Sequence, residues 1–119
     1  MAWKRNKGRY NIKPKSERTY KGIVYDSAFE MSYSQKLDLL VKKGEIVSWE
    51  RQVRYDIVVN GCKIGFYKLD FLVKYANGSV EHIDCKSTPK LVDPVYKLKK
   101  KLIQALYGIE IKEVYQKPS

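Results

Sequence analysis

The sequence has few of the residues from which disulfide frameworks and structural zinc sites are built. Its 119 residues include two cysteines, Cys62 and Cys85, and a single histidine, His82. Two cysteines cannot make a disulfide framework, and three N/S ligands are too few for a four-coordinate structural zinc site. We therefore expect a chain that folds without cross-links, which fits a reducing cytoplasm.

Long apolar runs are also missing. No stretch approaches the ~18 apolar residues that a membrane helix requires. The opening segment, MAWKRNKGRYNIKPK, has no apolar centre and does not read as a signal peptide. We expect no membrane association. A chain of 119 residues without internal repeats or a linker is long enough for one domain.

Acidic residues are scarce relative to basic ones, 13 against 24, and the net charge is +11. Such an excess favours a polyanionic partner. Residues 1–21 lack periodicity and interleave basic side chains with Trp3, Tyr10 and Tyr20, which predicts a flexible arm before a single domain at 22–119. A tail that only increases solubility is the alternative. The arm residues expected to contact phosphates are Lys4, Arg5, Lys7, Arg9, Lys13 and Lys15.

A first helix is predicted from Ser27 to Lys43. Ser27 and Glu30 have the spacing of a capping box, and Gly44 is a typical residue after a helix end. Glu30 therefore has a structural explanation as a cap, which leaves its part in any chemistry open. The apolar residues expected to face the core are Phe29, Tyr33, Leu37 and Leu40.

A second helix is predicted from Pro94 to about Tyr107, with Asp93 as its cap and Gly108 after its end. The residues expected to face inward are Val95, Leu98, Leu102, Ala105 and Leu106. The opposite side is basic, and we expect it to contact phosphates, although a merely solvated face is the alternative. The residues of this side are Lys97, Lys100, Lys101 and Gln104.

Period-2 alternation and turn residues predict the strands. A first strand before the Asn60-Gly61 turn should form an antiparallel meander with the next two. The last strand follows a helical crossover, which favours parallel pairing with the second arm of the hairpin. The fold class is therefore α/β, with a mixed sheet flanked by helices. The strand segments are 46–59, 62–66, 69–75, 80–86 and 109–115.

The loop between the third and fourth of these segments decides which acids meet. A three-residue loop, Ala76-Asn77-Gly78, sets Asp70 directly opposite Asp84, whereas a two-residue turn would set Asp70 opposite Cys85. We predict the three-residue loop because it keeps the apolar residues of both strands on one face. Asp84 and Lys86 then share a face with Asp70.

Two carboxylates facing each other at ~5 Å repel unless a cation lies between them. Asp70 and Asp84 offer the hard oxygen ligands that suit Mg²⁺ or Mn²⁺, and the backbone carbonyl of Cys85 could add one more. Such an ion would polarise a phosphodiester and acidify an attacking water, while Lys86 could stabilise developing charge. A surface network of ion pairs among the same residues is the alternative.

Glu30 on a helix, Asp70 on a strand and Asp84-Cys85-Lys86 on the next strand precede a basic helix. This set, in this order, resembles the PD-(D/E)xK nuclease superfamily, although Leu69 stands where that signature has proline. The segment KLKKKLIQALYGIEIKEV is also similar to small phage and prophage nucleases of that superfamily. The resemblance implies a restriction-endonuclease-like αβββαβ core. It also implies that Glu30, Asp70 and Asp84 hold the metal and that Lys86 is catalytic.

The expected function is a Mg²⁺- or Mn²⁺-dependent DNA endonuclease, similar to junction-resolving enzymes of phage recombination or replication. The resemblance implies branched or structured DNA as partner, a homodimer if junctions are resolved, and the cytoplasm of a bacterial host. A sequence-specific restriction-type endonuclease is the nearest rival, although base readout needs added elements in so small a chain. A non-catalytic nucleic-acid-binding module is the rival of another class.

Overall fold

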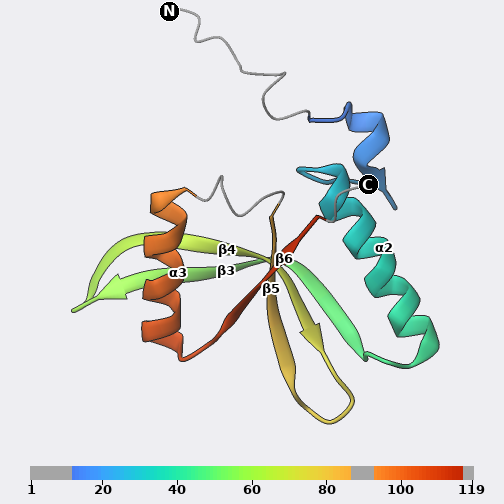
Figure 1. Cartoon of the computed structure of the whole chain (residues 1–119). Helices are drawn as coiled ribbons and strands as arrows, with labels where there is room; N and C mark the ends of the chain where they lie inside the picture. The colour runs from blue at the N-terminus through green and yellow to red at the C-terminus, as the bar shows by residue number, and fades with distance from the viewer. Residues whose placement is uncertain (1–11, 87–92, 117–119) are drawn as a thin grey trace, which may run out of the picture. The chain divides into compact units, whose positions relative to one another are not determined.

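The computed structural model of the chain describes residues 12–86 and 93–116 (Figure 1). The chain divides into two compact units, Met1–Lys36 and Leu37–Ser119. Within the described residues, no helix combines the length and the apolar character that crossing a bilayer requires.

Regular structure in the N-terminal unit begins nearer to the start of the chain than the sequence predicted. A 3-10 turn, η1 (Lys15–Arg18), leads into a two-stranded antiparallel hairpin, β1 (Thr19–Tyr20) and β2 (Ile23–Val24). Arg18 fixes this turn, because its Nε donates a hydrogen bond to the Lys13 carbonyl at 2.9 Å. The flexible arm over residues 1–21 stays a prediction, but its residues 15–20 form η1 and β1. Local hydrogen bonds, which leave no apolar periodicity in the sequence, stabilise them.

Helix α2 (Ala28–Lys43) confirms the first predicted helix. The Ser27 hydroxyl oxygen accepts the Glu30 backbone N–H at 3.1 Å, as an N-cap does. The helix ends at Gly44, whose φ of 79° is left-handed. Leu37 is buried, while the other members of the predicted apolar stripe, Phe29, Tyr33 and Leu40, are half-buried.

The C-terminal unit contains a four-stranded sheet in the order β3-β4-β5-β6. The first three strands form an antiparallel meander, and β6 pairs parallel with β5 after the crossover helix α3. The predicted α/β class, its αβββαβ order and its mixed sheet are confirmed. The bounds are β3 (Ser48–Val59), β4 (Cys62–Lys74), β5 (Val80–Lys86), α3 (Pro94–Tyr107) and β6 (Ile111–Tyr115).

Helix α3 packs against β3 and β4, as Figure 1 shows. Its caps agree with the sequence: the Asp93 carboxylate accepts the Val95 N–H at 3.0 Å, and Gly108 is left-handed. Its buried face differs in part from the one that the sequence predicted. Ile103 is buried, in a core cluster with Ile57, Tyr67, Leu69 and Ile111.

The predicted inward face of α3 was right for Leu102, which packs on the core cluster, and wrong for its other four members, because apolar residues occupy more than one side of this helix. Val95, Leu98 and Leu106 are 56%, 59% and 43% exposed. The side that packs on the sheet carries Ile103 and also Tyr96 and Lys100, whose polar ends meet β6. A polar side chain that reaches a partner inside the fold looks, in sequence, like a solvated one.

The β4–β5 hairpin has the predicted register. The Tyr75 N–H donates to the Ser79 carbonyl at 2.9 Å, so the loop contains three residues. Lys74 pairs with Val80, and the pairing continues to Phe71 with Ile83. The next pair in this register is Asp70 with Asp84.

We expect Gly78→Ala to lower the free energy of unfolding by about 1 kcal/mol, because a Cβ is disfavoured at left-handed φ. Gly78 has a φ of 89° and open space around it, so strain is the only cost. Urea denaturation measures the change. Gly65→Ala is the matched control, since Gly65 also has open space but no left-handed φ. Equal losses in both variants would contradict the proposed turn.

Candidate functional site

Three carboxylates lie side by side across the sheet. Asp70 on β4 lies directly beyond the last regular β4–β5 pair and donates its N–H to the Asp84 carboxylate on β5, and Asp84 is the parallel partner of Glu113 on β6. Residues that pair across neighbouring strands point to the same face of a sheet. We call Asp70, Asp84 and Glu113 the acidic row.

The strands β4 and β5 separate at the acidic row. Their regular pairing ends at Phe71 with Ile83, although both strands continue. Beyond that point the carboxylates bridge the strands. Asp84 Oδ1 accepts the Asp70 N–H at 3.1 Å, and Asp70 Oδ2 accepts the Cys85 N–H at 2.9 Å. Each aspartate therefore holds the backbone of the opposite strand.

The β3 strand is distorted at the same level. Gln52 would be opposite Asp70, but the pairing steps from Arg51 to Val53 and omits it. Gln52 has a φ of 55°, a left-handed value that is rare for a side-chain-bearing residue inside a strand. Strain of this kind is often found at functional sites.

The alternation of β4 changes next to this distortion. Leu69 and Leu72 both pack on the core cluster, although regular alternation sends residues three apart to opposite faces. The backbone therefore turns between Leu69 and Leu72, and Asp70 lies within this turn. The turn directs the Asp70 N–H toward β5 rather than β3.

Asp84 is the most unusual member of the acidic row. It is 2% exposed, and its Oδ2 has no hydrogen-bond partner among the described residues. Burial raises its pKa above the usual value, while the hydrogen bond from Asp70, the charge of Lys86 and the nearby Tyr96 hydroxyl oppose that rise. A buried carboxylate oxygen without a hydrogen-bond partner is costly, and the described residues leave this one unsatisfied.

Glu113 has the opposite environment. Its Oε1 accepts the Tyr115 hydroxyl at 2.6 Å, and its Oε2 accepts the Tyr96 hydroxyl at 2.8 Å. The Lys100 ammonium lies 3.2 Å from Oε2. These contacts, the Tyr115 hydrogen bond first, lower the pKa of Glu113 to about 2. Glu113 is therefore a fixed anion at the edge of the site.

Lys86 reaches the site from the end of β5. Its Nζ lies 3.4 Å from the centroid of the Tyr96 ring, a cation–π contact. The pKa of Tyr96 is raised, chiefly by burial and then by the charge of Asp84. Tyr96 is thus close to Asp84, holds Lys86 on its ring and is itself held by Glu113 through its hydroxyl.

The donor set fits a small divalent cation. Carboxylate oxygens are the ligands that Mg²⁺ and Mn²⁺ prefer, and Asp84 Oδ2 is a buried oxygen that needs a positive partner. Asp70 is its neighbour across the strands. Within residues 12–86 and 93–116, no group of three or more His, Cys, Asp or Glu side chains gathers around one metal position. Further ligands would come from the Cys85 carbonyl, water and substrate.

The structure brings together three of the four predicted catalytic residues, Asp70, Asp84 and Lys86. Glu30 lies in the first turn of α2, within the unit Met1–Lys36, and stays a prediction as a site residue. The basic residues predicted to bind nucleic acid divide into three groups. Lys13, Lys15, Lys97 and Lys101 are exposed; Gln104 is half-buried, as is Lys100, which pairs with Glu113; and Lys4, Arg5, Lys7 and Arg9 lie outside the described residues.

Glu113 and Tyr96 were not predicted as site residues. One signal was present: Glu113 follows Ile109 and Ile111 at period 2, so a carboxylate occupies an apolar phase of the last strand. The parallel register of β5 and β6 was needed to place Glu113 beside Asp84. Sequence spacing does not determine that register.

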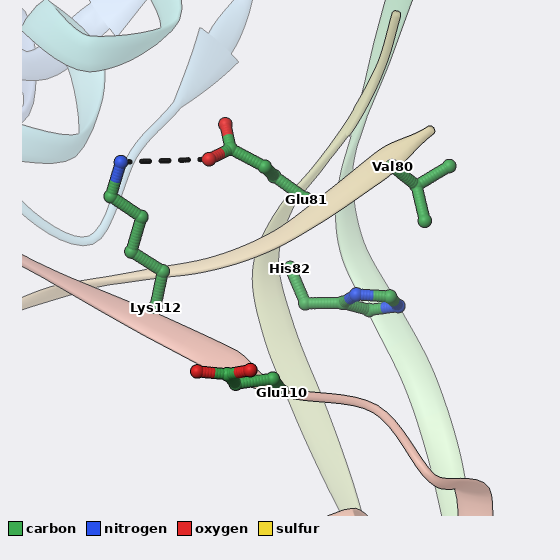
Figure 2. Close-up of a pocket in the computed structure, with 5 residues that line it drawn as sticks. All are labelled: Val80, Glu81, His82, Glu110 and Lys112. Carbon is green, nitrogen blue, oxygen red and sulfur yellow. Dashed lines mark ion pairs between the residues drawn. The ribbon is translucent and has the colours of Figure 1, made fainter. Parts of the chain in front are cut away.

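A pocket of about 310 Å³ lies elsewhere on β5 and β6 (Figure 2). Val80, Glu81, His82, Glu110 and Lys112 line it, and none of them belongs to the acidic row. The Glu81 carboxylate is already engaged, by the Tyr75 hydroxyl and by Lys112 Nζ at 3.5 Å. Burial lowers the pKa of His82. We assign the candidate site to the acidic row, because it contains the buried Asp84 Oδ2 to which no described residue donates a hydrogen bond.

The fold and the site define an α/β domain in which carboxylates gather where two central strands of a mixed sheet separate. The chain belongs to the family described as Protein of unknown function (DUF1064), which it matches over residues 8–117. No curated protein and no solved structure matches it. The family match includes every described residue, and therefore the whole acidic row.

We expect Asp84→Asn to raise the free energy of unfolding in EDTA at pH 7 by on the order of 1 kcal/mol, because it removes a buried anion with an unpaired oxygen. The pKa of Asp84 is raised in the folded state, so wild-type stability should fall as pH rises from the usual value of 3.8 through the raised one. Asp84→Asn should lack this fall. Thermal denaturation across pH measures both effects.

Asp56→Asn is the control for Asp84→Asn. Asp56 is exposed, and the neighbouring Arg54 and Lys63 lower its pKa, so its loss should leave stability unchanged or slightly reduced. Destabilisation of Asp84→Asn in EDTA would contradict the account of an unpaired buried charge.

We expect Glu113→Gln to flatten the acid limb of the stability profile. The folded pKa of Glu113 is about 2 against an ordinary 4.5, so its contribution is present above pH 4.5 and lost as pH falls toward 2. Urea midpoints at several pH values between these limits measure the slope for both proteins. Parallel slopes would show that Glu113 is not a strongly held anion.

Proposed function

We propose that this chain is a metal-dependent nuclease that hydrolyses phosphodiester bonds in DNA, as the resemblance to PD-(D/E)xK nucleases implies. The observation that carries the proposal is Asp84 Oδ2, a buried carboxylate oxygen to which no described residue donates a hydrogen bond, beside Asp70 where β4 and β5 separate. A divalent cation would satisfy that oxygen, and Lys86 follows on the same face.

In this proposal Asp70 and Asp84 hold Mg²⁺ or Mn²⁺, with the Cys85 carbonyl and Glu30 as further candidates. The bound ion supplies Lewis acidity toward the phosphodiester. Asp70 and Asp84 also hold the backbone of the opposite strand, so they are fixed before substrate binds.

Lys86 supplies positive charge for the phosphate as negative charge develops on its oxygens. Tyr96 is a positioning residue for it. The Tyr96 ring supports the Lys86 ammonium, and the hydrogen bond to Glu113 fixes the ring. The hydrolysis uses water as nucleophile and leaves no covalent intermediate on the chain.

Branched or structured DNA is the proposed substrate, within phage recombination or replication in the cytoplasm of a bacterial host. The net charge of +11 supports a polyanionic partner, and exposed Lys97 and Lys101 on α3 are available for phosphates. Cutting a junction on both strands needs two active sites, which would make the working form a homodimer.

A non-catalytic module that binds nucleic acid is the second candidate. The observation in its favour is the same positive charge, which by itself accounts for affinity without any chemistry. A sequence-specific endonuclease has no observation that favours it.

We expect the wild-type chain to cut a four-way DNA junction, or a flapped or single-stranded DNA, in Mg²⁺ or Mn²⁺ and not in EDTA. Asp70→Asn and Asp84→Asn should each reduce the rate at least about 100-fold, because each removes a proposed metal ligand. Lys86→Gln should reduce the rate but keep the metal-induced rise in melting temperature. Gel assays and thermal denaturation with and without Mn²⁺ measure these effects.

Glu45→Gln is the matched control, since Glu45 is an exposed carboxylate outside the acidic row, and this variant should cut at the wild-type rate. Paired cuts in the junction would support the resolving activity, whereas cuts in flaps or single strands would keep the chemistry and change the substrate. Binding to every DNA without metal-dependent cutting would establish the second candidate instead.

A further inference from the structure

Three cations surround one exposed aromatic ring on the β3–β4 ribbon. The guanidinium carbon of Arg54 lies 4.0 Å from the centroid of the Phe66 ring, Lys99 Nζ lies 5.5 Å from it, and Lys68 Nζ lies 6.0 Å from it. Phe66 is 37% exposed. We call Arg54, Phe66, Lys68 and Lys99 the Phe66 cluster; β3, β4 and α3 each contribute to it.

The positive charge of the Phe66 cluster is not balanced inside the fold. Arg54 and Lys68 are direct cross-strand partners, an arrangement that is unfavourable for like charges. Asp56 is the acid of this region, and it pairs with Arg54 at 3.1 Å and with Lys63 at 3.7 Å. Among the described residues, neither Lys68 nor Lys99 forms an ion pair with an acid. A polyanion would remove this repulsion.

Tyr107, a second exposed ring at this level of β3, does not belong to the cluster. It is 47% exposed, and its hydroxyl donates to the Asp56 carbonyl at 2.7 Å. Its ring packs against Tyr55, with the two centroids 5.2 Å apart. Tyr55 alternates with Arg54 along β3, so the Tyr107 ring lies on the other face of this strand. Phe66 is therefore the exposed ring on which the cations gather.

Exposed rings next to phosphate-binding cations are typical of surfaces that bind single-stranded nucleic acid. Every unpaired base offers a face for stacking, and the cations follow the backbone. A duplex presents phosphates but hides its base faces, so it could use the cations and not the ring. The combination favours an unpaired strand over a duplex, a membrane or an acidic protein.

We infer that the Phe66 cluster binds an unpaired segment of a nucleic acid strand. A base stacks on Phe66, while Arg54, Lys68 and Lys99 contact phosphates. The inference rests on the proposed function in taking nucleic acid as the partner, and it narrows the substrate to DNA with a single-stranded segment. Phe66 precedes Asp70 by four strand residues, about 13 Å, so one strand can reach both sites.

The test measures binding without cleavage. Fluorescence anisotropy in EDTA compares a labelled 20-nucleotide oligo(dT) with a 20-base-pair duplex, using the full chain. Phe66→Leu should weaken oligo(dT) binding at least about fivefold and leave duplex binding unchanged, because stacking is lost and charge is kept. Phe66→Tyr keeps the ring and should bind as the wild type does.

A charge variant tests the phosphate contacts. The triple variant Arg54→Gln, Lys68→Gln and Lys99→Gln should reduce the slope of log affinity against log salt for oligo(dT) by about 2. The matched control removes the same charge from exposed lysines of α2, as Lys36→Gln, Lys42→Gln and Lys43→Gln, and should change the slope much less. Unchanged melting temperatures show that all variants are folded.

Either of two results overturns the inference: Phe66→Leu that binds oligo(dT) as tightly as the wild type, or two triple variants with equal slopes. Absence of wild-type binding to oligo(dT) overturns it as well. The experiments distinguish failure of this inference from failure of the proposed nuclease activity. Phe66-dependent binding without metal-dependent cutting removes that activity and leaves this site, whereas cutting with Phe66-independent binding does the reverse.

Discussion

The separation of β4 and β5 is the constraint on which the rest of the site depends. Where two paired strands part, their backbone N–H groups lose their ladder partners and must find others. Asp70 and Asp84 provide them, each accepting an N–H from the opposite strand. The two carboxylates that accept these backbone N–H groups therefore lie next to each other. The left-handed φ of Gln52 on β3 is the distortion that accompanies this change in direction.

The acidic row combines two carboxylates with opposite electrostatic environments. Burial favours the protonated form of Asp84, whereas two tyrosine hydroxyls and Lys100 keep Glu113 ionised. Asp84 therefore keeps one oxygen to which no described residue donates a hydrogen bond, whereas Glu113 is saturated with donors. In known sites, two carboxylates with such different environments have different roles: one changes its protonation or its ligand, and the other stays ionised and holds neighbouring side chains in place. Glu113 has the fixing role here, through Tyr96, and Asp84 has the capacity for a new partner.

The sequence determined the local features of the fold and of the site, and it left open those that depend on long-range contacts. The three-residue loop alone placed Asp70 opposite Asp84, because hairpin register follows from loop length. The register of β6 on β5 follows from no local signal, so Glu113 was missed. The buried face of α3 was predicted only in part for a related reason: Tyr96 and Lys100 are polar in sequence but contact Glu113 inside the fold.

The parallel pairing of β5 with β6 also determines at which stage of folding the acidic row can form. The meander of β3, β4 and β5 involves neighbours in sequence, whereas β6 joins only after the α3 crossover has formed. Until then β5 is an edge strand, with Asp84 open to water and without Glu113 beside it. During synthesis on the ribosome, the acidic row is therefore completed after the rest of the sheet. A growing chain would carry much of its positive charge before it carries an assembled acidic row.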